Sequence, residues 1–275
     1  MKTHDASTHQ KHLNVGIQSS LAALALLMAA VAPALAGQGN LGNPGIAPPQ
    51  SHFRGRTYSE WSAAWFQWVM SMPFTQHPLF DDINPGVDCS DGQTGNVWFI
   101  GGHLGGKPAV NRSCTIPAGT ALFLNITSNG PVDNTGCDPT GTFVQPTTFS
   151  IDQLRTLADS FLDSSIDSRG QCEIDGVGIQ NLAGLDPPYR VQSSVFSYTI
   201  PAFDNLLVLI NCAPNAPCCY DNPPAADLTV AEAVADGVYV MIDPLPIGHH
   251  EIRFGNPGGV PLGNVYHITV TGRGH

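Results

Sequence analysis

The residues best suited to chemistry lie close together near the carboxyl end of the chain. His249 and Glu251 fall in residues 248–254, and His267 falls in residues 264–271. Both segments alternate apolar and polar side chains, so we expect a hairpin that places these three side chains on one face. Neighbouring strands hold such side chains roughly 5 Å apart at Cβ. Two imidazoles and a carboxylate in that arrangement can bind Zn²⁺, Cu²⁺ or Fe²⁺ and leave a position open for water or oxygen.

A second interpretation of the same segment stays open. On a solvated face, Glu251 pairs with Arg253 or with a histidine, and such a pair contributes only ~0–1 kcal/mol. His250 points to the other side, together with Ile252 and Phe254, and is then a histidine at the edge of the core.

A binding module is the other class of function that these residues allow. Its candidate contacts for a ligand are Trp98, His103 and Arg253. Trp98 lies in the apolar, aromatic run 96–100, and His103 follows it in a glycine-rich segment. Aromatic side chains on a concave sheet suit a glycan, a polymer or a small molecule. His103 would instead become a further metal ligand if the fold brought it near the hairpin.

An oxygen-rich segment is a second place where a cation could bind. Its residues are Asp81, Asp82, Asn84, Asp88 and Asp91. Calcium prefers such ligands, but the spacing matches no EF-hand loop, and Asp and Asn are also ordinary turn residues. The chain has no phosphate loop, dinucleotide-binding fingerprint or G-x-S-x-G motif. Nothing in the sequence selects two carboxylates for glycoside cleavage.

The elements that must position these residues are mainly strands. Residues 96–100 and 120–126 are apolar runs rich in strand formers, joined by a long glycine-containing loop and a turn. Residues 191–200 alternate, and residues 206–210 and 238–242 are further apolar runs. The pattern predicts an all-β fold, a jelly-roll-like β-sandwich with two or three peripheral α-helices.

The first of these helices has the clearest boundaries. Thr57 and Glu60 form a capping box at its start, and Pro73 ends it. Tryptophans follow at positions 61, 65 and 68. A stripe that repeats every three to four residues favours a hydrophobic plug across the end of the sandwich over a platform for glycans.

Two further helices are expected later in the chain. Ser150 and Gln153 form a capping box for a helix that ends near Ser164, with one apolar face. The residues of that face are Ile151, Leu154, Leu157, Phe161 and Leu162. The motif that starts at Thr229 predicts a short helix that Gly237 ends.

The seven cysteines indicate disulfides in an exported chain. By proximity we expect three pairs, which are Cys89 with Cys114, Cys137 with Cys172, and Cys212 with Cys218 or Cys219. The odd count leaves one thiol, expected from the adjacent Cys218–Cys219 pair. No CxxC…CxxC spacing typical of zinc sites is present.

The N-terminal residues predict export. Residues 1–36 resemble a secretory signal, with Lys2 and Lys11 before an apolar run too short to span a bilayer and Ala34-Leu35-Ala36 as the cleavage site. Residues 37–56, rich in Gly, Pro and Asn, are a predicted flexible segment. Residues 57–275 then form one β-sandwich domain. We expect a periplasmic or secreted protein with no membrane span.

The charge limits the partners. The formal net charge is −11, and loss of Lys2, Lys11 and Asp5 with the leader leaves 9 basic against 21 acidic residues, or −12. This balance disfavours nucleic acid and anionic membranes. The sequence therefore favours an exported protein that binds an extracellular glycan or polymer. A metal-dependent extracellular enzyme, hydrolytic or oxidative, is the alternative, and a structural envelope protein is the third possibility.

Overall fold

The computed structural model describes residues 42–80, 88–104, 109–165, 170–211, 219–221, 228–255 and 262–272. Several predictions fall outside these residues. They concern the leader 1–36, the oxygen ligands Asp81, Asp82 and Asn84, the cysteines Cys212 and Cys218, and the tip of the C-terminal hairpin at 256–261.

Strands dominate the structure. They account for 39% of the chain in several mixed sheets, so the predicted β-rich character is confirmed. The described part of the chain also contains three α-helices, which are α1 (Tyr58–Met70), α2 (Ile151–Ser165) and α3 (Leu206–Asn211). Short 3-10 helices occur at Phe74–Gln76, Pro78–Phe80 and Cys219–Asp221.

The central sheet has the strand order β1-β13-β4-β2, and β10 also pairs with β13. Its strands are β1 (Ile46–Ala47), β2 (Val97–Gly101), β4 (Ala121–Ser128), β10 (Arg190–Gln192) and β13 (Asp236–Ile242). All of β13 and nearly all of β4 is buried, which explains their continuous apolar sequences. The predicted strands at 96–100 and 120–126 are confirmed, and they pair in parallel as β2 and β4.

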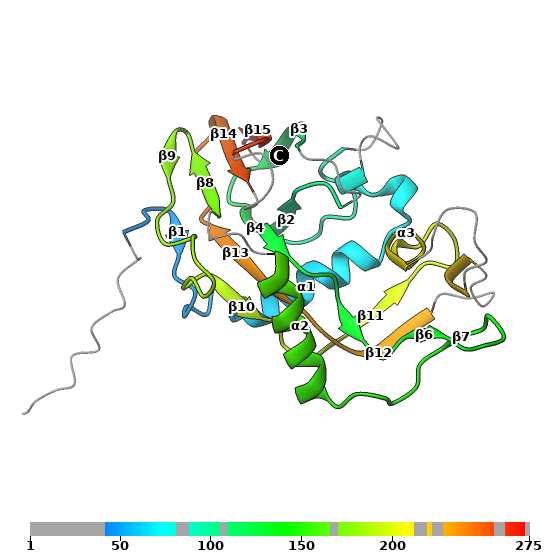
Figure 1. Ribbon diagram of the computed structural model, residues 1–275. Coiled ribbons are helices and arrows are strands. Elements are labelled where there is room, and N and C mark those ends of the chain that lie inside the picture. The colour runs from blue at the N-terminus through cyan, green and yellow to red at the C-terminus, as the bar shows by residue number, and fades with distance from the viewer. Residues whose placement is uncertain are drawn as a thin grey trace, which may run out of the picture. The chain divides into compact units, whose positions relative to one another are not determined.

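A second five-stranded sheet contains the C-terminal hairpin and has the order β3-β15-β14-β8-β9. Its strands are β3 (Asn111–Pro117), β8 (Gln171–Ile174), β9 (Val177–Gly178), β14 (Gly248–Gly255) and β15 (Asn264–Thr271). Figure 1 shows β3, β14 and β15 side by side. β14 and β15 are antiparallel as predicted, whereas β3 lies parallel to β15. The parallel pairs depart from the all-antiparallel order of a jelly roll.

The remaining strands form a three-stranded sheet, β11-β12-β5, and a ribbon, β6-β7. Their bounds are β5 (Val132–Asp133), β6 (Gly136–Cys137), β7 (Phe143–Val144), β11 (Phe196–Ile200) and β12 (Leu228–Val234). The predicted helix from Thr229 to Gly237 is wrong, because these residues pair as strands in β12 and β13. The predicted strand at 206–210 is helix α3. The predicted strand at 191–200 is divided between β10 and β11.

The described part of the predicted flexible segment, from Gly42 onward, is packed into the fold. Ile46 and Ala47 are buried in β1 against β13. The buried Asn43 side-chain amide donates to the Tyr189 hydroxyl at 2.9 Å. Its Oδ1 accepts from the Gln180 backbone N–H at 2.6 Å. Tertiary pairing of this short strand supplies an order that its Gly- and Pro-rich sequence does not indicate.

Helix α1 turns its tryptophan stripe toward the core, as predicted. Thr57 and Glu60 form the expected capping box. Trp61, Trp65 and Trp68 are 8%, 1% and 7% exposed, so the stripe faces the core. Because a buried indole N–H needs an acceptor, Trp65 donates to the Ile100 carbonyl of β2 at 3.1 Å. This contact helps to lock α1 onto the central sheet.

Helix α2 begins with the predicted capping box of Ser150 and Gln153. Leu154 and Leu162 are fully buried, but Phe161, expected on the same face, is 52% exposed. Arg190 of β10 fastens this helix, because its guanidinium contacts the α2 carboxylates of Asp159 and Asp163 as well as buried Asp236. Burial raises the pKa of Asp236, and its hydrogen bond with Arg190 offsets part of that shift.

Two disulfides lie within the described residues. Cys89 pairs with Cys114 as predicted. Cys137 pairs with Cys219 instead of Cys172, because the fold brings β6 next to the 3-10 helix at Cys219–Asp221. Cys172 of β8 is a buried free thiol. A search of the described residues found no helix with the length and hydropathy needed to cross a membrane.

Candidate functional site

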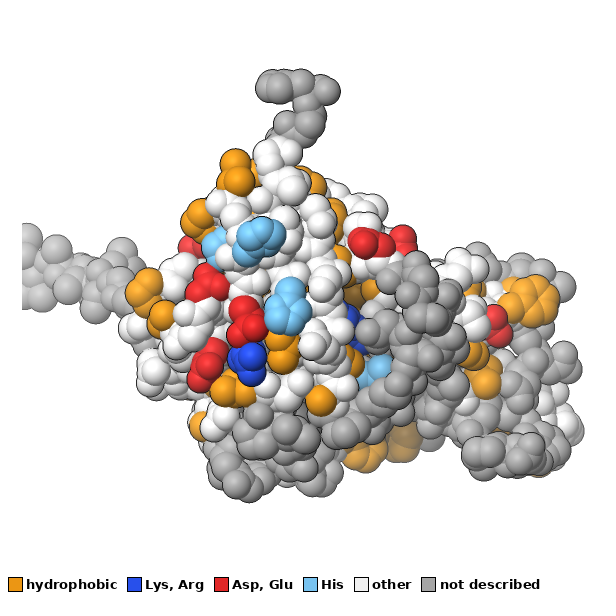
Figure 2. All heavy atoms as spheres, turned by 90° about the horizontal axis from the view of Figure 1, so that it is seen from above, with side chains coloured by type: hydrophobic (Ala, Val, Ile, Leu, Met, Phe, Trp, Pro, Cys, Tyr) orange, Lys and Arg blue, Asp and Glu red, His pale blue; other side chains and the backbone are white. Residues whose placement is uncertain are grey.

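The C-terminal hairpin places the three predicted metal ligands on one face. Glu251 and His267 are directly opposite in the register of β14 and β15, and His249 lies opposite Thr269. The alternate residues, Ile252 among them, are buried. Figure 2 shows histidine, acidic and basic side chains gathered on one surface, in agreement with the exposed positions of these strands. We call His249, Glu251, Arg253, His267 and Thr269 the hairpin face.

The charges of the hairpin face are paired with one another. Glu251 accepts from Arg253 Nε at 2.6 Å, and the carboxylate also lies 3.6 Å from Nδ1 of His267. The hydrogen bond from Arg253, with a smaller contribution from His267, lowers the pKa of Glu251. His249 Nδ1 is 3.1 Å from the Thr269 hydroxyl. These contacts leave Glu251 engaged by a cation of the protein itself.

His250 lies on the opposite side of β14 from these residues, as predicted. Its Nδ1 is 2.7 Å from the Asp175 carboxylate, and its Nε2 is 2.9 Å from the Pro246 carbonyl. Burial lowers the pKa of His250, but the hydrogen bonds with Asp175 and Pro246 outweigh it, so the pKa is raised. Both nitrogens have partners, which matches the expected histidine at the core edge.

The described residues contain no group of three or more His, Cys, Asp or Glu side chains arranged to hold a metal ion. Asp88 and Asp91, from the predicted oxygen-rich loop, instead hold a turn: the Asp88 N–H donates to the Asp91 carboxylate, and the Ser90 N–H donates to the Asp88 carboxylate. Their oxygens satisfy local backbone donors.

The three predicted ligand contacts lie on different elements. Trp98 is half-buried in β2, where it packs against the core. His103 follows β2, and its ring contacts Phe80 at a centroid distance of 5.5 Å. Arg253 lies on β14 beside Glu251.

A pocket of about 490 Å³ beside α1 is a site that the sequence did not predict. Its lining includes the aromatic side chains of Trp61, Trp68 and Phe99, which are buried or half-buried and which we call the floor, and the exposed side chains of Arg54, Arg56 and Gln67, which we call the rim. The ring centroids of Trp61 and Trp68 lie 6.3 Å and 5.6 Å from that of Phe99. We call this site the α1 pocket. Its volume is in the range of pockets that hold small ligands, and its lining combines aromatic and polar side chains.

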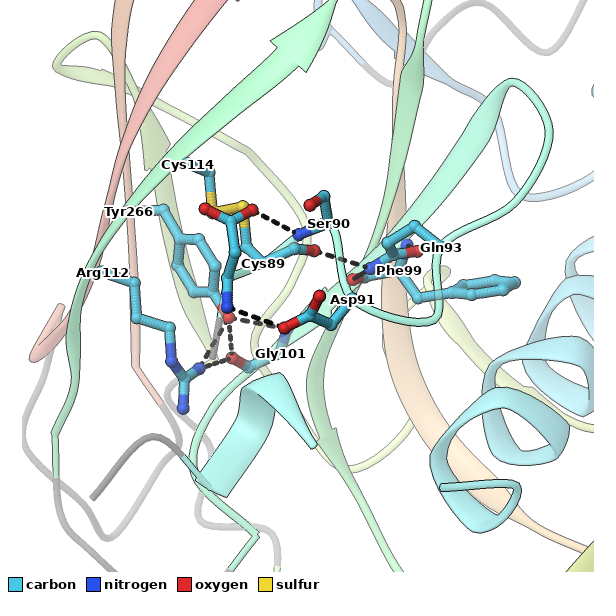
Figure 3. Close-up of a disulfide and its surroundings, with 10 residues drawn as sticks. Cys89, Ser90, Asp91, Gln93, Phe99, Gly101, Arg112, Cys114 and Tyr266 are labelled. Atoms are coloured by element: carbon cyan, nitrogen blue, oxygen red, sulfur yellow. Dashed lines mark hydrogen bonds between the residues drawn. A yellow bond between two sulfur atoms is a disulfide. The ribbon is translucent and has the colours of Figure 1, made fainter. Parts of the chain in front are cut away.

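One wall of the α1 pocket is the loop from Asp88 to Asn96, which is fixed at two points (Figure 3). The Cys89–Cys114 disulfide ties the loop to β3. The Gln93 amide docks it on β2, because Nε2 donates to the Phe99 carbonyl at 2.6 Å and the Phe99 N–H donates to Oε1 at 2.8 Å. The wall is therefore held in place before any ligand arrives.

The two arginines on the rim are placed by a tight turn before α1. Arg54 and Gly55 adopt positive φ values of 51° and 84°, and Phe53 and Arg56 form a β-bridge around them. Arg56 lies over the Trp61 ring at 5.0 Å, and Arg54 lies over Phe53 at 5.5 Å. The flat guanidinium suits such stacking, which restricts both side chains.

A donor without an acceptor lies beside the wall loop. Among the described residues, the buried Trp68 indole N–H has no hydrogen-bond partner. It sits beside Gly92 of the wall loop, where a Cβ would come within 3.2 Å of the nitrogen and even closer to the Met72 side chain. Only glycine fits at this position without moving Met72.

Another hollow, of about 380 Å³, surrounds Arg190 and the acidic residues of α2. Asp159, Asp163 and Asp236 all contact the guanidinium. We assign this group to the attachment of α2, since the guanidinium joins the carboxylates of this helix to Asp236 of β13.

Comparisons with models of known protein families, with curated proteins and with solved structures found no match to this chain. The site must therefore be interpreted from its own geometry. The signal that could have revealed the α1 pocket was Arg54-Gly55-Arg56 directly before the capping box, which places two cations at the start of a tryptophan-bearing helix.

Proposed function

We propose that this protein is exported and binds an extracellular glycan or polymer in the α1 pocket. The observation that carries the proposal is the combination of an aromatic floor, Trp61, Trp68 and Phe99, with a polar rim. A sugar ring has apolar C–H faces and polar edges, so it suits a surface that offers aromatic rings and hydrogen-bonding groups together. This places the binding surface beside α1 rather than at Trp98, His103 and Arg253.

Export is supported by the cysteine chemistry. The disulfides Cys89–Cys114 and Cys137–Cys219 suit an oxidising compartment, periplasmic or extracellular, and agree with the predicted leader at 1–36. The two-sheet sandwich remains part of the proposal, with the central sheet and the hairpin sheet as its layers.

The test is binding of the mature protein to soluble polysaccharides, measured as retardation in affinity gels and then as Kd by calorimetry. Ala64 of α1 lines the pocket, so Ala64→Leu fills it without removing a core side chain. We expect this variant to lose binding. Ser160→Leu, an exposed position on α2, is the matched control and should bind like the parent protein. Binding that Ala64→Leu leaves unchanged would contradict the location, and no binding to any saccharide would contradict the function.

A metal-dependent enzyme, hydrolytic or oxidative, is the second candidate. The observation in its favour is that His249, Glu251 and His267 share one face of adjacent strands. For this function, the Glu251 carboxylate would have to give up its hydrogen bond with Arg253 and bind Zn²⁺, Cu²⁺ or Fe²⁺ instead. Elemental analysis of the mature protein tests this: stoichiometric metal that a His249→Ala/His267→Ala variant loses would support the enzyme, and its absence would reject this site.

A further inference from the structure

The arginines of this acidic protein differ in whether an acidic side chain neutralises them. Arg190 contacts three aspartates, and Arg253 contacts Glu251. Arg54 and Arg56 are exposed, and no carboxylate among the described residues lies within ion-pair distance of either. Two cations that form no ion pair with a described carboxylate thus lie on the rim of one pocket, in a chain whose formal net charge is −11.

The nearest candidate counter-ion is already engaged. Glu60 is close enough to Arg56 for that charge to contribute to its lowered pKa, but the largest cause is the hydrogen bond from the Thr57 backbone. Its carboxylate accepts from the Thr57 N–H at 2.7 Å and from the Thr57 hydroxyl at 3.0 Å. The capping box therefore holds Glu60 at the start of α1 and leaves Arg56 free to pair with another anion.

The two guanidiniums are also positioned in advance. Arg54 Nη2 donates to the Gly119 carbonyl at 2.9 Å, and its plane lies over Phe53. Arg56 lies over Trp61, which forms part of the pocket floor. Side chains that are restricted before binding lose less entropy when a ligand arrives. Arginine also matches carboxylate and sulfate groups through paired hydrogen bonds.

We propose that the ligand of the α1 pocket is an anionic saccharide, whose carboxylate or sulfate groups pair with Arg54 and Arg56 while a sugar ring packs on the aromatic floor. This inference rests on the proposed glycan-binding function and names the class of glycan. The arginines supply charge selectivity, and the tryptophans supply contact with the ring.

The experiment compares trisaccharides of matched linkage that differ in one group. Calorimetry of the full mature chain would compare the trisaccharide of galacturonate with that of galactose, glucuronate with glucose, and mannuronate with mannose. A trisaccharide of 6-sulfated galactose separates recognition of sulfate from recognition of carboxylate. We expect an acidic member to bind about tenfold or more tightly than its neutral counterpart. Arg54→Gln/Arg56→Gln should remove this preference and leave weak neutral binding.

Two controls separate charge from structure. Arg54→Lys/Arg56→Lys retains the charge and should keep part of the preference, while Arg253→Gln on the hairpin face should keep all of it. Thermal unfolding of each variant shows whether it is folded. Equal affinity for acidic and neutral sugars, or a preference that survives Arg54→Gln/Arg56→Gln, would overturn the inference and leave glycan binding intact. Absence of binding to every trisaccharide and every polysaccharide would overturn both.

Discussion

The hairpin face and the α1 pocket both carry arginine, but within the described part of the chain only the arginine of the hairpin face forms an ion pair with a carboxylate. Arg253 Nε and Glu251 Oε1 lie 2.6 Å apart, and His267 lies opposite Glu251 on the neighbouring strand. On the rim of the α1 pocket, Arg56 faces an aromatic ring instead of a carboxylate. A cluster of chemically capable residues is therefore a weaker sign of function when its members already satisfy one another.

The two regions also differ in shape. The hairpin face is the outer surface of a sheet, with exposed side chains in rows. The α1 pocket is a hollow between a helix, a β-bridge and a cystine-anchored loop. A concave site with an apolar floor can exclude water from a ligand, which strengthens each polar contact made there.

The largest expected effect comes from removing the disulfide that anchors the wall loop of the α1 pocket. Cys89→Ala/Cys114→Ala removes a cross-link between residues 25 apart in sequence, and we expect the free energy of unfolding to fall by about 3 kcal/mol. Ligand binding should weaken about tenfold, because the freed loop must be ordered on binding. Urea titration and calorimetry measure the two effects.

The control for this variant is the other disulfide. The Cys137–Cys219 disulfide joins residues 82 apart in sequence and so closes a longer loop, and its removal in Cys137→Ala/Cys219→Ala should destabilise the protein at least as much. Because neither cysteine lines the α1 pocket, the affinity of the folded fraction should not change. Equal loss of affinity in both variants would show that the wall loop has no special role.

A smaller perturbation of the same wall is Gln93→Ala. It leaves the N–H and carbonyl of Phe99 without their side-chain partners, at an expected cost of about 1–3 kcal/mol in stability and a measurable loss of affinity. Gln145→Ala is the matched control, since Gln145 makes an exposed hydrogen bond to the Thr229 carbonyl. If both variants unfold at the same urea concentration, Gln93 does not anchor the wall.

The free energy of unfolding should depend on pH through His250 of β14. The raised pKa of His250 means that its charged form is favoured in the folded state, so its contribution to stability is present below its unfolded pKa of about 6.5 and is lost as pH rises through the folded value. The loss should be under about 1 kcal/mol, because Asp175 is half-exposed. Urea unfolding at pH 5.5 and 8.5 should show a difference that His250→Gln reduces.

Ligand affinity should stay nearly constant between pH 6 and 8 if the α1 pocket is the site. No histidine lines that pocket. A steep change of affinity near neutral pH would instead show that a histidine takes part in binding, either His52 beside the arginine turn or a histidine of the hairpin face.

The smallest expected effect is that of Arg253→Gln. The Arg253 and Glu251 side chains are 45% and 37% exposed, so solvent screens the pair and stability should not change measurably. Affinity for the ligand should equal that of the parent protein. A loss of affinity of more than about tenfold would show that the hairpin face takes part in binding.

Local signals in the sequence predicted much of the fold. The Thr57–Glu60 capping box and the tryptophan stripe located α1, and two-residue alternation assigned the inward and outward sides of β14 and β15. These features depend on neighbours along the chain, where periodicity is informative.

The failures involve partners that are distant in sequence. The segment from Thr229 carries a helix-start motif, yet pairing with β11 and β4 draws it into two strands. Cys137 finds Cys219, 82 residues away, rather than Cys172. The α1 pocket was missed for the same reason, because its wall and floor come from the loop before β2, from β2 itself and from α1.

The most direct test of a functional α1 pocket is an NMR titration of the mature protein with the acidic trisaccharide that binds most tightly. We predict shifts of the Trp61 and Trp68 indole N–H signals, with the imidazole signals of His249 and His267 unchanged. Shifts at these histidines, with the two indole signals unmoved, would contradict the assignment of function to the pocket.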